Sequence, residues 1–161
     1  MKIKVSILFI CFLVTFGCND TPKKESKPTT PEVVEKKAKE LNLILNSNDQ
    51  MQFDKKVLSA SPGQKVTLTL NHTGRGNKMI MGHNFVLLKS GIDVDDFARR
   101  AVEAIDSEYI PEGDEMIAYT TLIGGGETTS VTFEAPSTGI YTFICTFPAH
   151  YQLMKGQLIV K

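Results

Sequence analysis

The chain has 161 residues, with 18 basic and 18 acidic side chains, and 42% of its residues are hydrophobic. This length is enough for one domain with a substantial core and short for two. From residue 41 to the C-terminus there are ten Lys or Arg residues and thirteen Asp or Glu residues, a net charge of −3. A nucleic-acid-binding domain would carry a basic excess, so this partner class is excluded.

The first 17 residues have the features of a secretory signal peptide. Two lysines precede the 12-residue apolar run VSILFICFLVTF, which is shorter than the roughly 20 residues of a membrane helix. The run ends in TFGC, which resembles a bacterial lipoprotein signal, although the usual leucine three residues before the cysteine is Thr15. We expect a signal peptide over 1–17 and a lipidated Cys18. The alternatives are plain secretion, or a leader retained as an anchor, with Cys18 as an ordinary cysteine.

The next segment has the composition of a tether. Residues 19–40 contain three prolines, eleven charged residues of both signs and no aromatic residue. Such a segment cannot bury enough apolar surface to offset the entropy that it would lose on ordering. We therefore expect a flexible tether over 18–40 and one folded domain over 41–161.

The domain is predicted to consist mostly of β-strands. Short runs rich in β-branched and aromatic residues, separated by turn residues, occur at 41–46, 56–59, 66–70, 84–88, 116–121, 129–134, 140–145 and 157–160. About eight strands at this spacing indicate an all-β sandwich. In the segment 94–105, by contrast, apolar residues recur at helical spacing behind acidic residues that favour a helix N-terminus. The expected fold is a β-sandwich with one inserted helix.

The loop FICTFPAHYQLM carries a possible metal site. Cys145, His150 and Met154 stand in it at Cys-x4-His-x3-Met spacing. A thiolate, an imidazole and a thioether form a soft ligand set that selects copper over magnesium or calcium. Cys145 is also the only cysteine after residue 40, so no disulfide within the domain accounts for it. His83, just before a predicted strand, can reach this loop at one end of a sandwich, but a hydrogen-bonded structural imidazole remains the alternative for it.

Several separate blocks of the domain resemble azurins, which are cupredoxins with one type 1 copper ion. The blocks occur in azurin order and are NSNDQMQF (46–53), MGHN (81–84), LIGGGETTSVTF (122–133), CTFPAH (145–150) and LMKG (153–156). The resemblance implies a Greek-key, cupredoxin-like β-sandwich. It also implies five copper ligands: His83, Cys145 and His150 as the strong set, the Met154 thioether as a weak axial ligand, and the Gly82 carbonyl opposite it.

The same resemblance implies roles for residues beside the ligands. Asn84 corresponds to an asparagine that ties the ligand loops together, backbone N–H groups near Phe147 would donate toward the thiolate, and His72 corresponds to a histidine that is not a ligand. The chain also departs from azurins at three places: Leu41 and Gln64 replace the cysteines of the family's disulfide, Phe85 replaces a buried tryptophan, and Tyr151 and Gln152 replace small residues.

The implied function is that of a monomeric carrier of single electrons in the bacterial envelope. An enzyme would need an open position on the metal, which five protein ligands do not leave, or a second metal, for which only His72 remains. The alternative is a periplasmic copper-binding or delivery protein, which clusters of methionines or exposed cysteines would favour. Redox partners such as c-type cytochromes or copper or haem reductases are expected to dock on an apolar patch around an exposed edge of His150. The predicted patch consists of Met51, Met81, Phe147, Pro148, Ala149 and Leu153.

Overall fold

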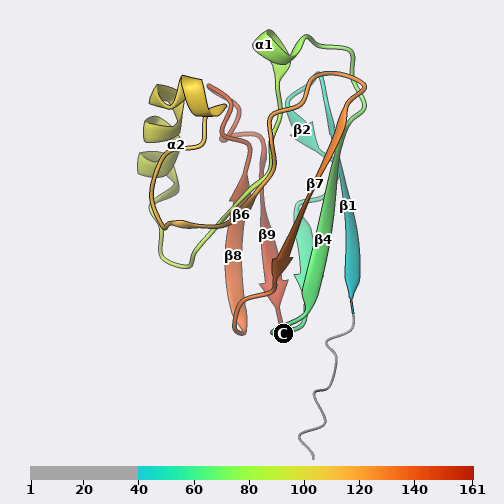
Figure 1. Cartoon of the computed structure of the whole chain (residues 1–161), viewed down its shortest axis with the longest axis vertical. Coiled ribbons are helices and arrows are strands. Elements are labelled where there is room, and N and C mark those ends of the chain that lie inside the picture. Colours follow the sequence, from blue (N-terminus) through green and yellow to red (C-terminus); the bar gives the residue numbers. More distant parts are fainter. Residues whose placement is uncertain (1–39) are drawn as a thin grey trace, which may run out of the picture. The chain divides into compact units, whose positions relative to one another are not determined.

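The computed structural model describes residues 40–161 (Figure 1). The predicted signal peptide, Cys18 and almost all of the predicted tether lie outside the described residues. Within them, two β-sheets form a sandwich, and one longer helix lies beside it (Figure 1). This confirms the predicted all-β sandwich with an inserted helix.

The first sheet has four strands in the order β2-β1-β4-β7. Its strands are β1 (Leu41–Asn48), β2 (Gln52–Phe53), β4 (Lys65–His72) and β7 (Thr128–Glu134). β1 runs parallel to β4, while the β1–β2 and β4–β7 pairs are antiparallel. Along β4 every second residue is buried, which directs Val66, Leu68 and Leu70 into the core. The same alternation makes His72 a buried residue at the end of the strand.

The second sheet has five strands in the order β3-β9-β8-β5-β6. Its strands are β3 (Val57–Ala60), β5 (Val86–Leu88), β6 (Met116–Tyr119), β8 (Gly139–Ile144) and β9 (Lys155–Val160). β3 runs parallel to β9, and the other pairs are antiparallel. Residues of both sheets form one core, in which Phe143 lies 5.7 Å from Phe53 and 5.4 Å from Phe85 between ring centroids. Phe85, which replaces a tryptophan of azurins, is fully buried and fills a position in this core.

The inserted helix is α2 (Val94–Glu103). The Asp93 carboxylate caps its N-terminus by accepting from the backbone N–H groups of Asp95 and Asp96 at 3.0 and 3.1 Å. Its buried face packs on β5 and β8 in a small cluster of Val86, Leu88, Phe97, Ala98 and Ile144. The Arg100 guanidinium donates to both carboxylate oxygens of Glu115 at 2.7 Å and so anchors the helix to the chain just before β6.

The structure differs from the predicted elements at several places. Residues 40–161 form nine strands instead of about eight, because the two-residue β2 pairs with the end of β1. β5 starts at Val86 and not at Asn84, and Phe85 N–H donates to the side-chain oxygen of Thr120 rather than to a strand carbonyl. The predicted helix over 94–105 ends at Glu103, and a 3-10 turn, η1 (Ile105–Ser107), follows it. The sequence also gave no signal for α1 (Lys78–Met81), because a single helical turn is too short to show periodicity.

Candidate metal centre

Three of the predicted ligand residues meet at one end of the sandwich, which we call the metal-site end. Cys145 directly follows β8, and His83 lies just before β5. These two strands pair, with Val86 opposite Ile144, and this register brings the two side chains together. His150 reaches them from the loop between β8 and β9, and the ligand atoms of all three residues lie within 4.8 Å of one another.

The geometry of this cluster fits a metal ion. Cys145 Sγ lies 3.9 Å from His83 Nδ1 and 3.8 Å from His150 Nδ1, and the two Nδ1 atoms are 3.2 Å apart. Cys145 and His83 are fully buried, and His150 is 3% exposed. Two imidazole nitrogens and one thiolate sulfur converging in a water-excluded space form a donor set that suits copper.

A hydrogen bond selects the tautomer of His83. Its Nε2 lies 3.0 Å from the carbonyl oxygen of Asn48, which can only accept. Nε2 therefore carries the proton, and the lone pair of Nδ1 points into the cluster. Backbone carbonyls commonly orient metal-binding histidines in this way. No sequence pattern indicates this role of Asn48, because the contact uses only its backbone.

Burial also controls the protonation of the cluster in the metal-free protein. Burial lowers the pKa of His83 and of His150 to about 4, so both imidazoles are neutral at pH 7. It raises the pKa of the Cys145 thiol to about 12. The backbone N–H groups of Asn84 and Phe147 act in the opposite direction on this pKa, because they donate toward the sulfur. The two histidines are thus ready to bind a metal, whereas the cysteine must first lose its proton.

The loop between β8 and β9 folds back on itself through backbone hydrogen bonds. His150 N–H donates to Phe147 O at 3.0 Å, and Met154 N–H donates to His150 O at 2.8 Å. Cys145 N–H closes the loop by donating to Met154 O at 2.9 Å. Met154 is fully buried and belongs to the core cluster that contains Cys145. The fold therefore holds the predicted axial residue at the same end of the core as the cysteine.

Gly82 stands where no side chain fits. A Cβ atom at this position would lie 2.4 Å from the carbonyl oxygen of Lys78 and 2.9 Å from a methyl carbon of Leu122. The chain therefore needs glycine here to bring α1 close to Leu122 and to place His83 directly after the turn.

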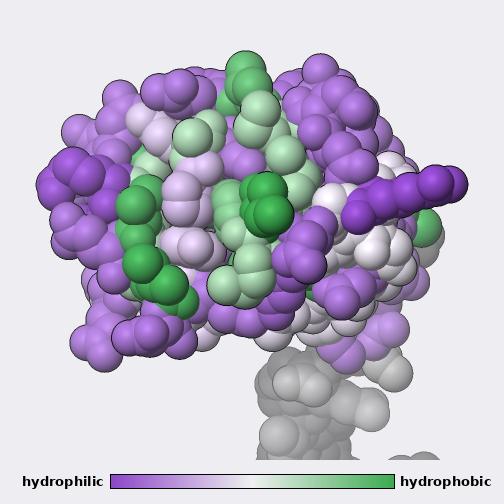
Figure 2. Space-filling view, turned by 90° about the horizontal axis from the view of Figure 1, so that it is seen from above, coloured by the Kyte–Doolittle hydropathy of each residue, from purple (hydrophilic) through white to green (hydrophobic). Residues whose placement is uncertain are grey.

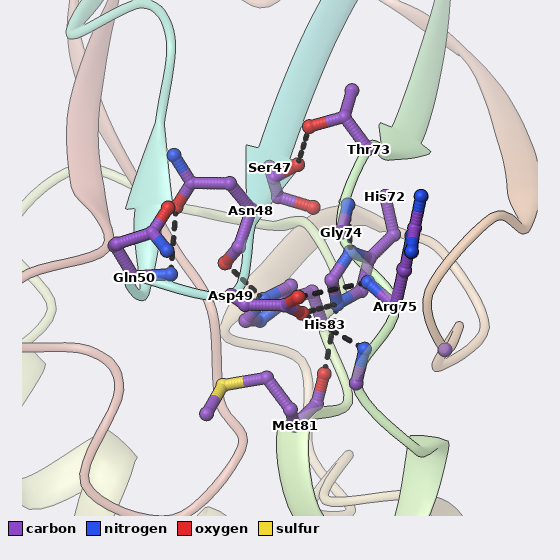
Figure 3. A network of polar contacts seen from close by, with 12 residues as sticks. Ser47, Asn48, Asp49, Gln50, His72, Thr73, Gly74, Arg75, Met81 and His83 are labelled. Carbon is purple, nitrogen blue, oxygen red and sulfur yellow. Dashed lines mark hydrogen bonds and ion pairs between the residues drawn. The ribbon is translucent and has the colours of Figure 1, made fainter.

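His72 lies next to this cluster without facing it. Its ring stacks on that of His83 with 4.3 Å between centroids. Its Nδ1 accepts from Gly74 N–H at 3.1 Å and its Nε2 lies 3.0 Å from Met81 O, so both ring nitrogens already have protein partners. Figure 3 shows this network, in which the Asp49 carboxylate also accepts from the backbone N–H of Arg75. His72 is therefore held by the protein on both sides of its ring, and its role outside the ligand set stays a prediction.

The predicted apolar patch is only partly at the surface. His150, whose edge was expected to be exposed, is 3% exposed, and Phe147 is 8% exposed. Both are covered because the Phe147 ring packs between Tyr109 and His150, at 5.1 and 4.7 Å between ring centroids. Met51, Met81 and Pro148 are half-buried, while Ala149 and Leu153 are exposed. Tyr151 is partly buried and packs against the small cluster under α2.

Two exposed apolar residues that were absent from the prediction lie at the same end. Met79 and Ile80, in α1 just before Gly82 and His83, are 74% and 73% exposed. Figure 2 looks down on this end and shows hydrophobic side chains gathered within a hydrophilic border. The sequence signal was available in the pair of apolar residues beside MGHN, but their exposure depends on the turn of α1.

The sequence is similar to those of known azurins and of a related outer membrane protein. Azurin from Bordetella pertussis is 41% identical over 127 residues, which are 75% of this chain and 84% of that azurin. Outer membrane protein H.8 from Neisseria gonorrhoeae is 42% identical over 118 residues, 71% of this chain and 64% of H.8.

A solved structure and a family model also match this chain. Auracyanin A, a "blue" copper protein from Chloroflexus aurantiacus, superimposes with a TM-score of 0.70 at 33% identity, covering 76% of this chain and all of auracyanin A. The family model for copper binding proteins of the plastocyanin/azurin family matches residues 39–161. The chain therefore belongs to the plastocyanin/azurin family of copper binding proteins.

Proposed function

We propose that this protein carries single electrons between redox proteins of the bacterial envelope, using one type 1 copper ion. The observation that carries the proposal is the buried convergence of two histidine Nδ1 atoms and one cysteine sulfur within 4.8 Å. We assign His83, Cys145 and His150 as the strong ligands, Met154 as the axial ligand and the Gly82 carbonyl as the fifth. Bound there, copper supplies a one-electron couple, because this ligand set accepts both Cu(II) and Cu(I).

The residues around the ligands support a carrier by holding the site in one geometry. Asn48 O fixes the tautomer of His83, and the Asn84 side chain joins the segment after His83 to the segment after Cys145. A site that is held in this way before the metal changes its charge reorganises little during electron transfer. The Phe147 ring covers His150 and helps to exclude water from it.

The same burial disfavours the two rival functions. A delivery protein must expose its ligands to the acceptor, whereas His83, Cys145 and Met154 are fully buried. A metalloenzyme must leave a position for substrate. Two surface cavities in residues 40–161, of about 300 and about 380 Å³, are lined by none of the five assigned ligands.

We infer that partners such as c-type cytochromes or copper or haem reductases dock on the metal-site end, above His150. The exposed residues Ile80, Met79 and Leu153 supply apolar contact area there, and Ala149 adds to it. A contact made by a few apolar residues suits short-lived redox complexes, which bury little surface. The protein acts as a monomer in this proposal.

We further propose that the mature protein is tethered to a membrane through lipidated Cys18, with 1–17 removed as a signal peptide and 18–40 as the tether to the domain at 41–161. The TFGC sequence supports this, as does the likeness to an outer membrane protein. None of the helices in residues 40–161 is long and apolar enough to cross a membrane. Cys18→Ala should release the protein into the soluble fraction or leave the leader uncleaved, and acyl labelling of the wild type should fail if Cys18 is not lipidated.

The electron-carrier proposal is tested by adding Cu(II) to the metal-free protein. A copper bond to the Cys145 thiolate should give an intense blue charge-transfer band, with reversible one-electron reduction. Cys145→Ser should lose the band. Thr142→Ser, in β8 and three residues before Cys145, is the control and should keep it. A wild-type protein that binds copper without colour would contradict the assignment.

A further inference from the structure

The side chain of Lys56 reaches the loop that carries the ligands. Its Nζ donates to the carbonyl oxygen of Leu153 at 2.6 Å, across 97 residues of sequence. Leu153 is joined through this carbonyl to Met154, the assigned axial ligand. Lys56 itself lies in the short connection between β2 and β3, outside every block that resembles azurins.

The backbone around Lys56 is fixed against the end of the same loop. Its carbonyl oxygen accepts from Gln157 N–H at 2.9 Å, where β9 begins to pair with β3. The carbonyl of Leu153 and the N–H of Met154 belong to one peptide unit, and Met154 N–H donates to His150 O. Both polar groups of this peptide unit therefore have partners, one of them an ammonium group.

Within the part of the chain that the structure describes, Lys56 forms no ion pair. No carboxylate in residues 40–161 lies within 4.0 Å of its Nζ, whereas the neighbouring Lys55 Nζ is 3.0 Å from Asp54 Oδ2 and 2.8 Å from Ile44 O. Lys55 and Lys56 are adjacent and carry the same charge, but their ammonium groups contact different parts of the domain. Of these two lysines, Lys56 is the one whose ammonium group donates to the loop between β8 and β9.

We propose that Lys56 is a positioning residue for the metal centre. Its ammonium group holds the Leu153–Met154 peptide in place and raises the reduction potential of the site. The inference rests on the proposed electron-carrier function. Reduction lowers the charge of the site by one, so a nearby positive charge favours the reduced form. A hydrogen bond from an ammonium group is also about twice as strong as one between neutral groups, and it polarises the peptide that leads into Met154. Because Lys56 is exposed, salt and water weaken its effect.

The first measurement is the reduction potential of three variants at one pH and ionic strength. Lys56→Met removes the charge and keeps most of the side-chain length. At a fixed solution potential it should lower the ratio of reduced to oxidised protein about two- to fivefold, or about 20 to 40 mV, since tenfold is 59 mV for one electron. Lys56→Arg should restore the wild-type ratio. Lys55→Met is the matched control, with the same loss of charge, and should change the ratio much less.

The second measurement does not depend on electron transfer. In the metal-free protein, the carbonyl carbon resonance of Leu153 should move in Lys56→Met and stay in place in Lys55→Met. An unmoved resonance in Lys56→Met would show that the bond is absent in solution and would overturn the proposal. An unchanged potential in Lys56→Met, or equal shifts in it and in Lys55→Met, would overturn it as well. If the wild type never gives the blue band, the proposed function fails, and the carbonyl measurement still decides whether Lys56 holds the loop.

Discussion

Asn84 and Thr146, 62 residues apart in the sequence, exchange two buried hydrogen bonds next to the assigned ligands His83 and Cys145. Asn84 Nδ2 donates to Thr146 Oγ1 at 2.8 Å, and Thr146 N–H donates to Asn84 Oδ1 at 2.9 Å. Each residue directly follows an assigned ligand, His83 or Cys145. The pair therefore fixes the distance between two assigned ligands that are far apart in the sequence.

Asn84→Ala should destabilise the metal-free protein by about 2–4 kcal/mol, because it leaves two buried polar groups of Thr146 without partners. Chemical unfolding followed by circular dichroism measures this loss. Asn42→Ala, at an exposed site on β1, is the control and should stay within about 0.5 kcal/mol of the wild type. Equal stability of the two variants would show that the Asn84–Thr146 bonds contribute little.

The metal-free protein should lose stability as the pH falls from about 6.5 to about 4. In the unfolded chain a histidine binds its proton near pH 6.5, whereas burial lowers the pKa of His83 and His150 to about 4. Between these values the unfolded state binds more protons, so the free energy of unfolding falls by up to about 1.4 kcal/mol per pH unit for each imidazole. Below pH 4 both states are protonated at these sites, and the histidines add no further loss.

Urea unfolding at half-unit pH steps checks this dependence. His150→Gln removes one of the two imidazoles and should reduce the slope between pH 6 and pH 4.5. A free energy of unfolding that stays constant between pH 7 and pH 5 in the wild type would contradict the lowered pKa values.

Met154→Leu should leave copper bound and raise the reduction potential. The thioether is a weak donor to the metal, and its loss disfavours Cu(II) more than Cu(I). Leucine has a similar volume, so the fully buried position should repack with a loss of less than about 1.5 kcal/mol. Voltammetry of the copper-loaded variant gives the result, and an unchanged or lowered potential would remove Met154 from the ligand set.

Ile80→Lys should slow electron self-exchange by about tenfold or more if the metal-site end is the docking surface. A lysine in this apolar contact must be desolvated in each encounter, which costs on the order of 1–3 kcal/mol. The position is 73% exposed, so the substitution should leave folding and the copper spectrum unchanged.

Ile140→Lys provides a matched control for this experiment. Ile140 is 58% exposed and lies near the start of β8, five residues before Cys145 and away from the metal-site end. The two variants have the same net charge, and both rates are measured at the same ionic strength. If Ile140→Lys slows exchange as much as Ile80→Lys, net charge governs the encounter, and the proposed docking surface loses its support.

The sequence by itself determined the features that depend on neighbouring residues. Alternation of apolar and polar residues predicted most strands and the helix at 94–105, because side chains alternate along a strand and repeat every 3.6 residues along a helix. The spacing of Cys145, His150 and Met154 pointed to a soft metal site, since the three share one short loop. Single-turn α1 and two-residue β2 carry too little pattern to be predicted.

Only the tertiary structure decided which distant groups meet. The pairing of β5 with β8 brings His83 to Cys145, the Asn48 carbonyl selects the tautomer of that histidine, and Lys56 reaches Leu153 across 97 residues. It also decided that Phe147 covers His150, which the sequence had led us to expect at the surface. Strand register, backbone carbonyl positions and side-chain burial arise from the packing of the whole domain, so no local stretch of sequence specifies them.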